Sequence, residues 1–199
     1  MSAVLGYEAM AGEEMAERVW VDTPGSHRFR TGCKDELLAA ICELRPRKGA
    51  RLVLLGTEVD GLAEAARQKL LGRVGFVPAS GGLISSLNAW ENISLQAAYH
   101  GTQPVARIAK TAREALAALG ADPQRFLARL PDEMDPFERK LVAFLRLLAK
   151  EPALAVIDGL GEGLNREQSA RAARFEAEYR ARQPEGTLLF VDLAEETLQ

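Results

Sequence analysis

The feature that most constrains the fold is the alternation of apolar and helical segments in the last third of the chain. Residues 137–151 space their apolar side chains as a helix does, and the apolar run 153–158 then ends in Asp158 and a glycine-rich turn. Helix-forming residues over 166–182 lead to a second apolar run over 187–192. Strands that alternate with helices favour an α/β fold with a mostly parallel sheet.

The same alternation is visible earlier in the chain. Helical spacing dominates the middle of the sequence, and short apolar runs ended by Gly or Pro precede it. We therefore expect a single domain over residues 1–199, with a helical lobe at about 87–150. The earlier predicted elements are short antiparallel strands within residues 1–30, strands over 51–56 and 72–78, and a helix over 62–71.

Composition excludes several classes of protein. The net charge is −3 and the two cysteines are nine positions apart, so we expect neither a nucleic-acid partner nor a bound metal. The first residues lack the basic start of a secretory signal, and no apolar run reaches the ~18 residues that span a bilayer. These features predict a protein of a reducing cytoplasm with no direct membrane insertion.

Four segments, in their order along the chain, resemble the nucleotide-binding subunit of ABC transporters. They are ELRPRKGARLVLLG, GFVPASGGLISSLNAWENISL, LPDEMDPFERKLVAFLRLLAKEPALAVIDGLGEGLN and GTLLFVDLAEE. The resemblance implies a P-loop NTPase-like ABC ATPase fold, with a mostly parallel sheet, an N-terminal antiparallel strand region and a helical subdomain. Within that family, the resemblance points to the ATPases of lipid-transport systems that maintain outer-membrane lipid asymmetry.

The stretch GTEVDGLA is similar in its outer glycines to the family's phosphate loop. A phosphate loop needs a Lys for the outer phosphates and a Ser or Thr for Mg²⁺, and here Leu62 and Ala63 stand in those places. Two carboxylates in the same stretch would repel a polyanion. Under this alignment, the vestigial loop residues are Gly56, Gly61, Leu62 and Ala63.

The other family motifs are also altered. Ala79 stands where the family has the glutamine that senses the attacking water, and residues 134–138 stand where it has the signature glycines. Asp158 is kept at the end of its strand, but Gly159 replaces the glutamate that orients water, and a glycine cannot accept a proton. The switch histidine is missing as well. We therefore expect a pseudo-ATPase with no cofactor and no catalytic residue.

The resemblance implies a role through binding. We expect a structural or regulatory partner of a membrane permease subunit or another ABC transport component, cytoplasmic and peripheral to the inner membrane, with homo- or heterodimers possible. In the family, the groove after the glutamine loop receives a helix of the membrane subunit. The apolar residues predicted to form this partner surface are Leu83, Ile84, Leu87 and Trp90.

Other interpretations remain open from the sequence. The chain is alternatively a weak or non-standard ATP-binding subunit that uses Asp158, in which case ATP and Mg²⁺ would be its cofactors. Asp158 is also explained as a polar strand end that caps a turn, and the glycines by turn geometry alone. A third alternative is an unrelated α/β interaction module.

Overall fold

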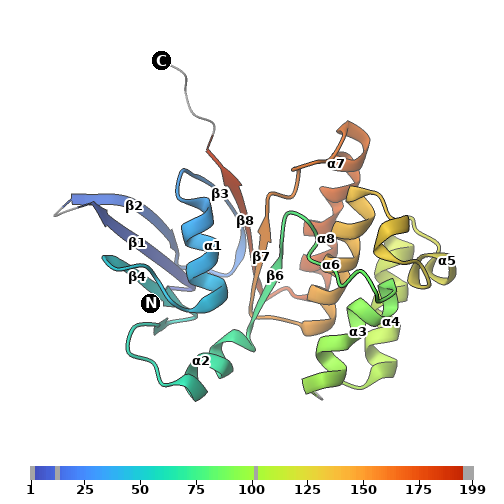
Figure 1. Ribbon diagram of the computed structural model, residues 1–199, viewed down its shortest axis with the longest axis horizontal. Coiled ribbons are helices and arrows are strands. Elements are labelled where there is room, and N and C mark those ends of the chain that lie inside the picture. The colour runs from blue at the N-terminus through green and yellow to red at the C-terminus, as the bar shows by residue number, and fades with distance from the viewer. Residues whose placement is uncertain (1–2, 12–13, 101–102, 195–199) are drawn as a thin grey trace. The chain divides into compact units, whose positions relative to one another are not determined.

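The computed structural model describes residues 3–11, 14–100 and 103–194, and these form two compact units. Unit 1 contains Met1–Phe76, Ala153–Gly159 and Glu185–Gln199, and unit 2 contains Val77–Pro152 and Leu160–Pro184. The strands that form sheets gather in the first unit and most of the helices in the second (Figure 1).

Unit 1 is built on two sheets. The strands β1 (Leu5–Ala11), β2 (Glu14–Val21), β4 (Ala50–Leu54) and β5 (Thr57–Glu58) form an antiparallel sheet in the order β2-β1-β4-β5. The second sheet has the order β3-β8-β7-β6, from β3 (Gly25–Thr31), β8 (Thr187–Leu193), β7 (Leu154–Asp158) and β6 (Val74–Val77). Within it, β3, β8 and β7 run parallel.

The helix α1 (Lys34–Glu43) covers the core of unit 1, and α2 (Glu64–Leu71) follows β5. Leu37 and Ile41, one helical turn apart, are fully buried, and they belong to one apolar cluster with Tyr7 of the antiparallel sheet and Leu189 of the parallel one. Burying side chains of this size contributes roughly 1.5–3 kcal/mol each. The apolar spacing of α1 therefore joins the two sheets into one core.

Unit 2 is helical. Its elements are α3 (Ala89–His100), α4 (Val105–Ala118), α5 (Pro123–Leu127), the 3₁₀ turn η1 (Pro131–Glu133), α6 (Pro136–Lys150), α7 (Arg166–Ala172) and α8 (Arg174–Arg182). Phe137 and Phe144 of α6 are fully buried, and the Phe144 ring stacks on Phe175 of α8 with centroids 4.3 Å apart. In the described parts of the chain, no helix is both long and apolar enough to cross a bilayer.

Most of the predicted elements are confirmed, including the strands at 72–78, 153–158 and 187–192. The strand at 51–56 exists as β4, and it lies in the antiparallel sheet, where it pairs with β1 and β5. The sequence interpretation also missed the parallel strand β3 and the helix α1 that follows it.

Candidate functional site

The candidate site of unit 1 lies where β3 passes into α1. β3 ends at Thr31 and α1 begins at Lys34, so only Gly32 and Cys33 separate the strand from the helix. The strand β7 ends at Asp158 and is separated from β3 in the sheet by β8 alone. Because β3, β8 and β7 are parallel, the β3–α1 junction and Asp158 lie at the same edge of the sheet, where α/β folds usually bind ligands.

A buried ion pair joins these two points. The Lys34 Nζ atom lies 2.8 Å from Oδ1 of Asp158, and the two side chains are only 8% and 15% exposed. At this edge of a sheet, a lysine neutralises phosphate and an aspartate holds Mg²⁺ in phosphate-binding proteins. Here the two groups bind each other.

The short loop before α1 is held by Thr31. The Thr31 hydroxyl donates to a Glu17 carboxylate oxygen at 2.7 Å and accepts from the Cys33 backbone N–H at 3.2 Å. Cys33 occupies the N-cap position and makes no side-chain capping bond, and burial raises the pKa of its thiol. A phosphate loop wraps its ligand with about eight residues, so this two-residue connection is too short to do so.

A hollow of about 520 Å³ opens beside the loop. Three of its lining residues are acidic, Glu17, Asp35 and Glu36, and one is basic, Arg47. The Arg47 guanidinium is paired with Glu36 at 3.0 Å. The excess of negative charge disfavours a polyanion in this hollow.

The predicted phosphate-loop residues lie elsewhere in unit 1. Gly56 lies in the β4–β5 hairpin of the antiparallel sheet, and Gly61 lies in the connection to α2, with Ala63 as the N-cap of that helix and Leu62 just before it. The alignment of this stretch with a phosphate loop does not fit the topology, because a phosphate loop follows a parallel strand. The two carboxylates of the stretch include Glu58, which pairs with Arg51 at 2.8 Å.

Gly159 directly follows Asp158, as the sequence predicts. Its backbone has a φ of 49°, in the left-handed region that glycine adopts without strain, and its N–H donates to the Val191 carbonyl at 2.9 Å. The residue is buried. Gly159 therefore stabilises the end of the strand through its backbone, and it has no side chain that could take part in catalysis. Ala79, the other predicted vestige, follows β6 in unit 2 and is half-buried.

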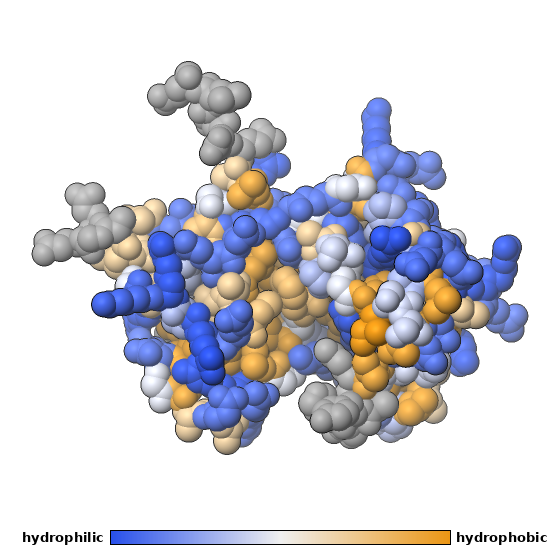
Figure 2. Space-filling model, viewed as in Figure 1, coloured by the Kyte–Doolittle hydropathy of each residue, from blue (hydrophilic) through white to orange (hydrophobic). Residues whose placement is uncertain are grey.

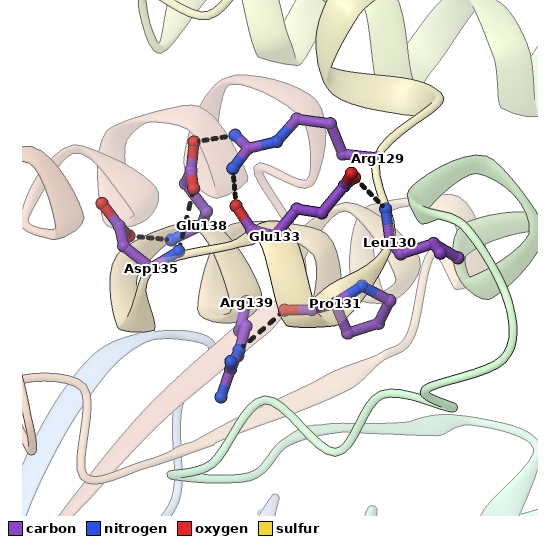
Figure 3. A network of polar contacts seen from close by, with 7 residues as sticks. All are labelled: Arg129, Leu130, Pro131, Glu133, Asp135, Glu138 and Arg139. Atoms are coloured by element: carbon purple, nitrogen blue, oxygen red, sulfur yellow. Dashed lines mark hydrogen bonds and ion pairs between the residues drawn. The ribbon is translucent and has the colours of Figure 1, made fainter.

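The start of α6 in unit 2 is closed by its own side chains (Figure 3). The Asp135 carboxylate accepts from the Glu138 N–H at 2.8 Å, and the Glu138 carboxylate accepts from the Asp135 N–H at 2.9 Å. Pro136 occupies the first turn and has no N–H to offer. Arg129 contacts both the Glu138 carboxylate and the Glu133 carbonyl. These contacts do not favour the binding of an external phosphate at the start of α6.

The predicted partner surface also lies in unit 2. Ile84 is 45% exposed, and Leu83, Leu87 and Trp90 are half-buried. The buried Asn92 amide fixes the segment, since it donates to the Ile84 and Leu87 carbonyls and accepts from the Ile84 N–H. Figure 2 shows hydrophobic side chains gathered on the visible face of this unit, over the helices α3 to α5.

A hollow of about 580 Å³ adjoins this surface. Trp90 lines it from α3, Arg113 from α4, and Gln124 and Leu127 from α5. The lining combines an aromatic ring, an aliphatic side chain and a guanidinium group, which is a composition found at the centres of protein interfaces.

Lys34 is the residue that sequence reasoning missed. The signal was present as Gly-Cys-Lys before apolar residues at helical spacing, Leu37, Leu38 and Ile41. It was hidden because this loop is short and the glycine pair at 56 and 61 is closer to the usual spacing of a phosphate loop.

No protein-family model matches the chain. Over 141 residues it is 31% identical to an uncharacterized ABC transporter ATP-binding protein, YbbA of Escherichia coli (strain K12), a match that covers 70% of this chain and 60% of that protein. Over 116 residues it is 30% identical to the ABC transporter ATP-binding protein YtrE of Bacillus subtilis (strain 168), covering 58% of this chain and 48% of the relative. The match thus spans less than two thirds of the length of either relative.

Solved structures show the fold. The chain superposes on cbiO1 of Clostridium perfringens, part of the ABC transporter complex cbiONQ, with a TM-score of 0.74, 14% identity and coverage of 98% of this chain and 80% of that one. A dimeric ATP-binding cassette, MJ0796 bound to ADP and Pi, gives a TM-score of 0.68 and 17% identity, covering 98% of this chain and 88% of the other. At these identities the likeness concerns the fold alone.

Proposed function

We propose that this chain, which has the fold of an ABC ATPase domain, acts by binding a partner and does not hydrolyse ATP. It serves as a structural or regulatory subunit of an ABC transport system, where a membrane permease subunit or another transport component is its partner. Lipid transport is the system proposed, on the resemblance of its motifs. The site of action is the cytoplasmic face of the inner membrane.

The observation that carries the proposal is Gly159. A hydrolytic site needs a side chain that accepts a proton from water or orients it, directly beyond the strand that ends in Asp158. Gly159 has no such side chain, and its backbone N–H is engaged with Val191. The self-capped start of α6 supports the same conclusion, because Pro136 has no N–H and the Asp135 carboxylate places a negative charge at the start of the helix.

The sequence alignment suggested that the phosphate-loop lysine is missing, and this was one reason to expect a protein without ATPase activity. That reason no longer holds. The β3–α1 junction is the proposed counterpart of the phosphate loop, and it contains Lys34. What supports inactivity there is the loop itself, which has two residues where a phosphate loop has several, and Asp35, which follows the lysine where Ser or Thr would bind Mg²⁺.

The proposed docking surface is the segment before α3 together with the hollow beside Trp90. Ile84 offers an exposed apolar side chain on a backbone fixed by Asn92. A preorganised apolar surface of this kind lowers the ordering cost of association.

This role can be tested by recovering the tagged chain from detergent-solubilised membranes and identifying bound permease subunits by mass spectrometry. Ile84→Asp should reduce the recovered permease at least fivefold. Met15→Asp is the matched control, since Met15 is a 54% exposed apolar residue of unit 1, and it should leave recovery unchanged. Equal recovery with both variants would exclude this surface.

A second candidate function is a weak ATP-binding subunit that energises transport. Lys34 and Asp158 favour it, because they are residue types that bind phosphate and Mg²⁺ at this edge of the sheet. Calorimetry with ATP and Mg²⁺ separates the two candidates, since only the second predicts heat of binding.

A further inference from the structure

The Lys34–Asp158 pair carries an inference about how the junction is kept closed. Lys34 is the first residue of α1 and its side chain is 8% exposed, so its ammonium group is almost removed from solvent. An ammonium group in such a place needs a partner that compensates its lost hydration. The Asp158 carboxylate, 2.8 Å away, is that partner.

We propose that Asp158 is a built-in anion that occupies Lys34 and thereby keeps the β3–α1 junction closed to phosphates from outside. This inference rests on the proposed assignment of that junction as the counterpart of a phosphate loop. It makes the ion pair an autoinhibitory contact, because the ammonium group of Lys34 is held by a carboxylate of the same unit.

The geometry indicates that Asp158 holds Lys34 in the place of a phosphate, and not merely that the junction lacks a ligand. Asp158 ends β7 and its neighbour Gly159 is fixed to Val191 of β8, so the carboxylate is presented from a backbone tied into the sheet. Lys34 begins α1, directly after a short loop held by the bond between Thr31 and Glu17. Both charges are therefore carried by ordered backbone, and an incoming phosphate must displace the carboxylate to reach the ammonium.

The other carboxylates near the loop limit how far the affinity for phosphate can rise when Asp158 is neutralised. Glu36 is paired with Arg47, Glu17 accepts from Thr31, and Asp35 is exposed on the first turn of α1. These carboxylates stay in place when Asp158 is neutralised. Release of Lys34 should therefore produce a measurable phosphate site of modest affinity.

The test is calorimetric titration of the full chain with inorganic pyrophosphate at low salt. Asp158→Asn removes the built-in anion at nearly constant volume, and it should bind pyrophosphate at least tenfold more tightly than the wild type. The double variant Lys34→Met/Asp158→Asn should lose this gain. Glu43→Gln removes an equal charge from the other end of α1 without releasing Lys34, and it should change the affinity less than threefold.

The inference is overturned if Asp158→Asn binds no better than wild type, if the double variant keeps the gain, or if Glu43→Gln gives the same gain. Failure of the proposed function looks different, because the wild type would then itself bind ATP with Mg²⁺.

Should Asp158→Asn fail to fold, Asp158→Ser and amine acetylation of Lys34 provide the readout. Acetylation of Lys34 should be at least tenfold slower than that of the exposed Lys48 in the wild type, and the difference should shrink in the Ser variant; equal rates in the wild type would overturn the inference.

Discussion

The starts of α1 and α6 are held by different kinds of contact. Every helix begins with backbone N–H groups that lack partners within the helix. At α6 the reciprocal bonds of Asp135 and Glu138 supply those partners at the surface. At α1 the N-cap Cys33 makes no side-chain capping bond, and the first helical residue, Lys34, forms a buried ion pair with Asp158.

The difference shows what each position does for the fold. The capping box of α6 is local, since its partners are three residues apart. The pair at α1 joins residues 34 and 158, and so ties the N-terminal helix to the end of a strand from the C-terminal half. We therefore expect α1 to be sensitive to the loss of one charge and α6 to tolerate it better.

The largest expected effect comes from breaking the buried pair. Lys34→Met leaves the Asp158 carboxylate without its cation, and we expect the free energy of unfolding to fall by about 3 kcal/mol. Urea denaturation at neutral pH measures it. The double variant Lys34→Met/Asp158→Leu removes both charges and should recover most of the lost stability. If Lys34→Met alone were as stable as the wild type, the ion pair would not contribute to stability.

The capping box should matter less. Asp135→Ala removes the acceptor for the Glu138 N–H, and we expect a loss of about 1 kcal/mol in the same urea experiment. Asp132→Ala is the control, since Asp132 is exposed in η1 and is not the N-cap of α6. If both alanine variants lost the same stability, the capping role would be wrong.

The smallest effect should come from the surface pair beside the loop that the sequence suggested as the phosphate site. Arg51 and Glu58 are 52% and 53% exposed, and solvent screens their attraction. Glu58→Gln should leave the urea midpoint unchanged, and it should also leave ATP binding unchanged. If this variant gained ATP binding, the β4–β5 hairpin would again be the candidate phosphate site.

The strands and helices were predictable where one periodicity runs without interruption. The apolar helix of α6, the strand ending in Asp158 and the closing strand β8 all follow from local spacing, and Gly159 was correctly placed after the strand. The sheet to which a strand belongs was not predictable for β4, because its apolar run suits either sheet and only the pairing with β1 and β5 decides.

The candidate site was harder to predict for the same reason. Lys34 and Asp158 are far apart in the sequence and acquire meaning only when β3 and β7 are placed in one parallel sheet. The edge strand β3 carries His27, Arg28 and Arg30 and lacks the continuous apolar run that marks a buried strand. A polar edge strand and a two-residue loop therefore concealed the junction.

We propose that the chain keeps the fold of an ABC ATPase and does not carry out its chemistry. Calorimetric titration of the wild-type chain with ATP and Mg²⁺ tests it most directly. We expect no heat of binding up to millimolar ATP, because Lys34 is held by Asp158 and the loop is too short to wrap phosphates. Binding in the micromolar range, a gain of about 8 kcal/mol, that is lost in Lys34→Met would contradict it.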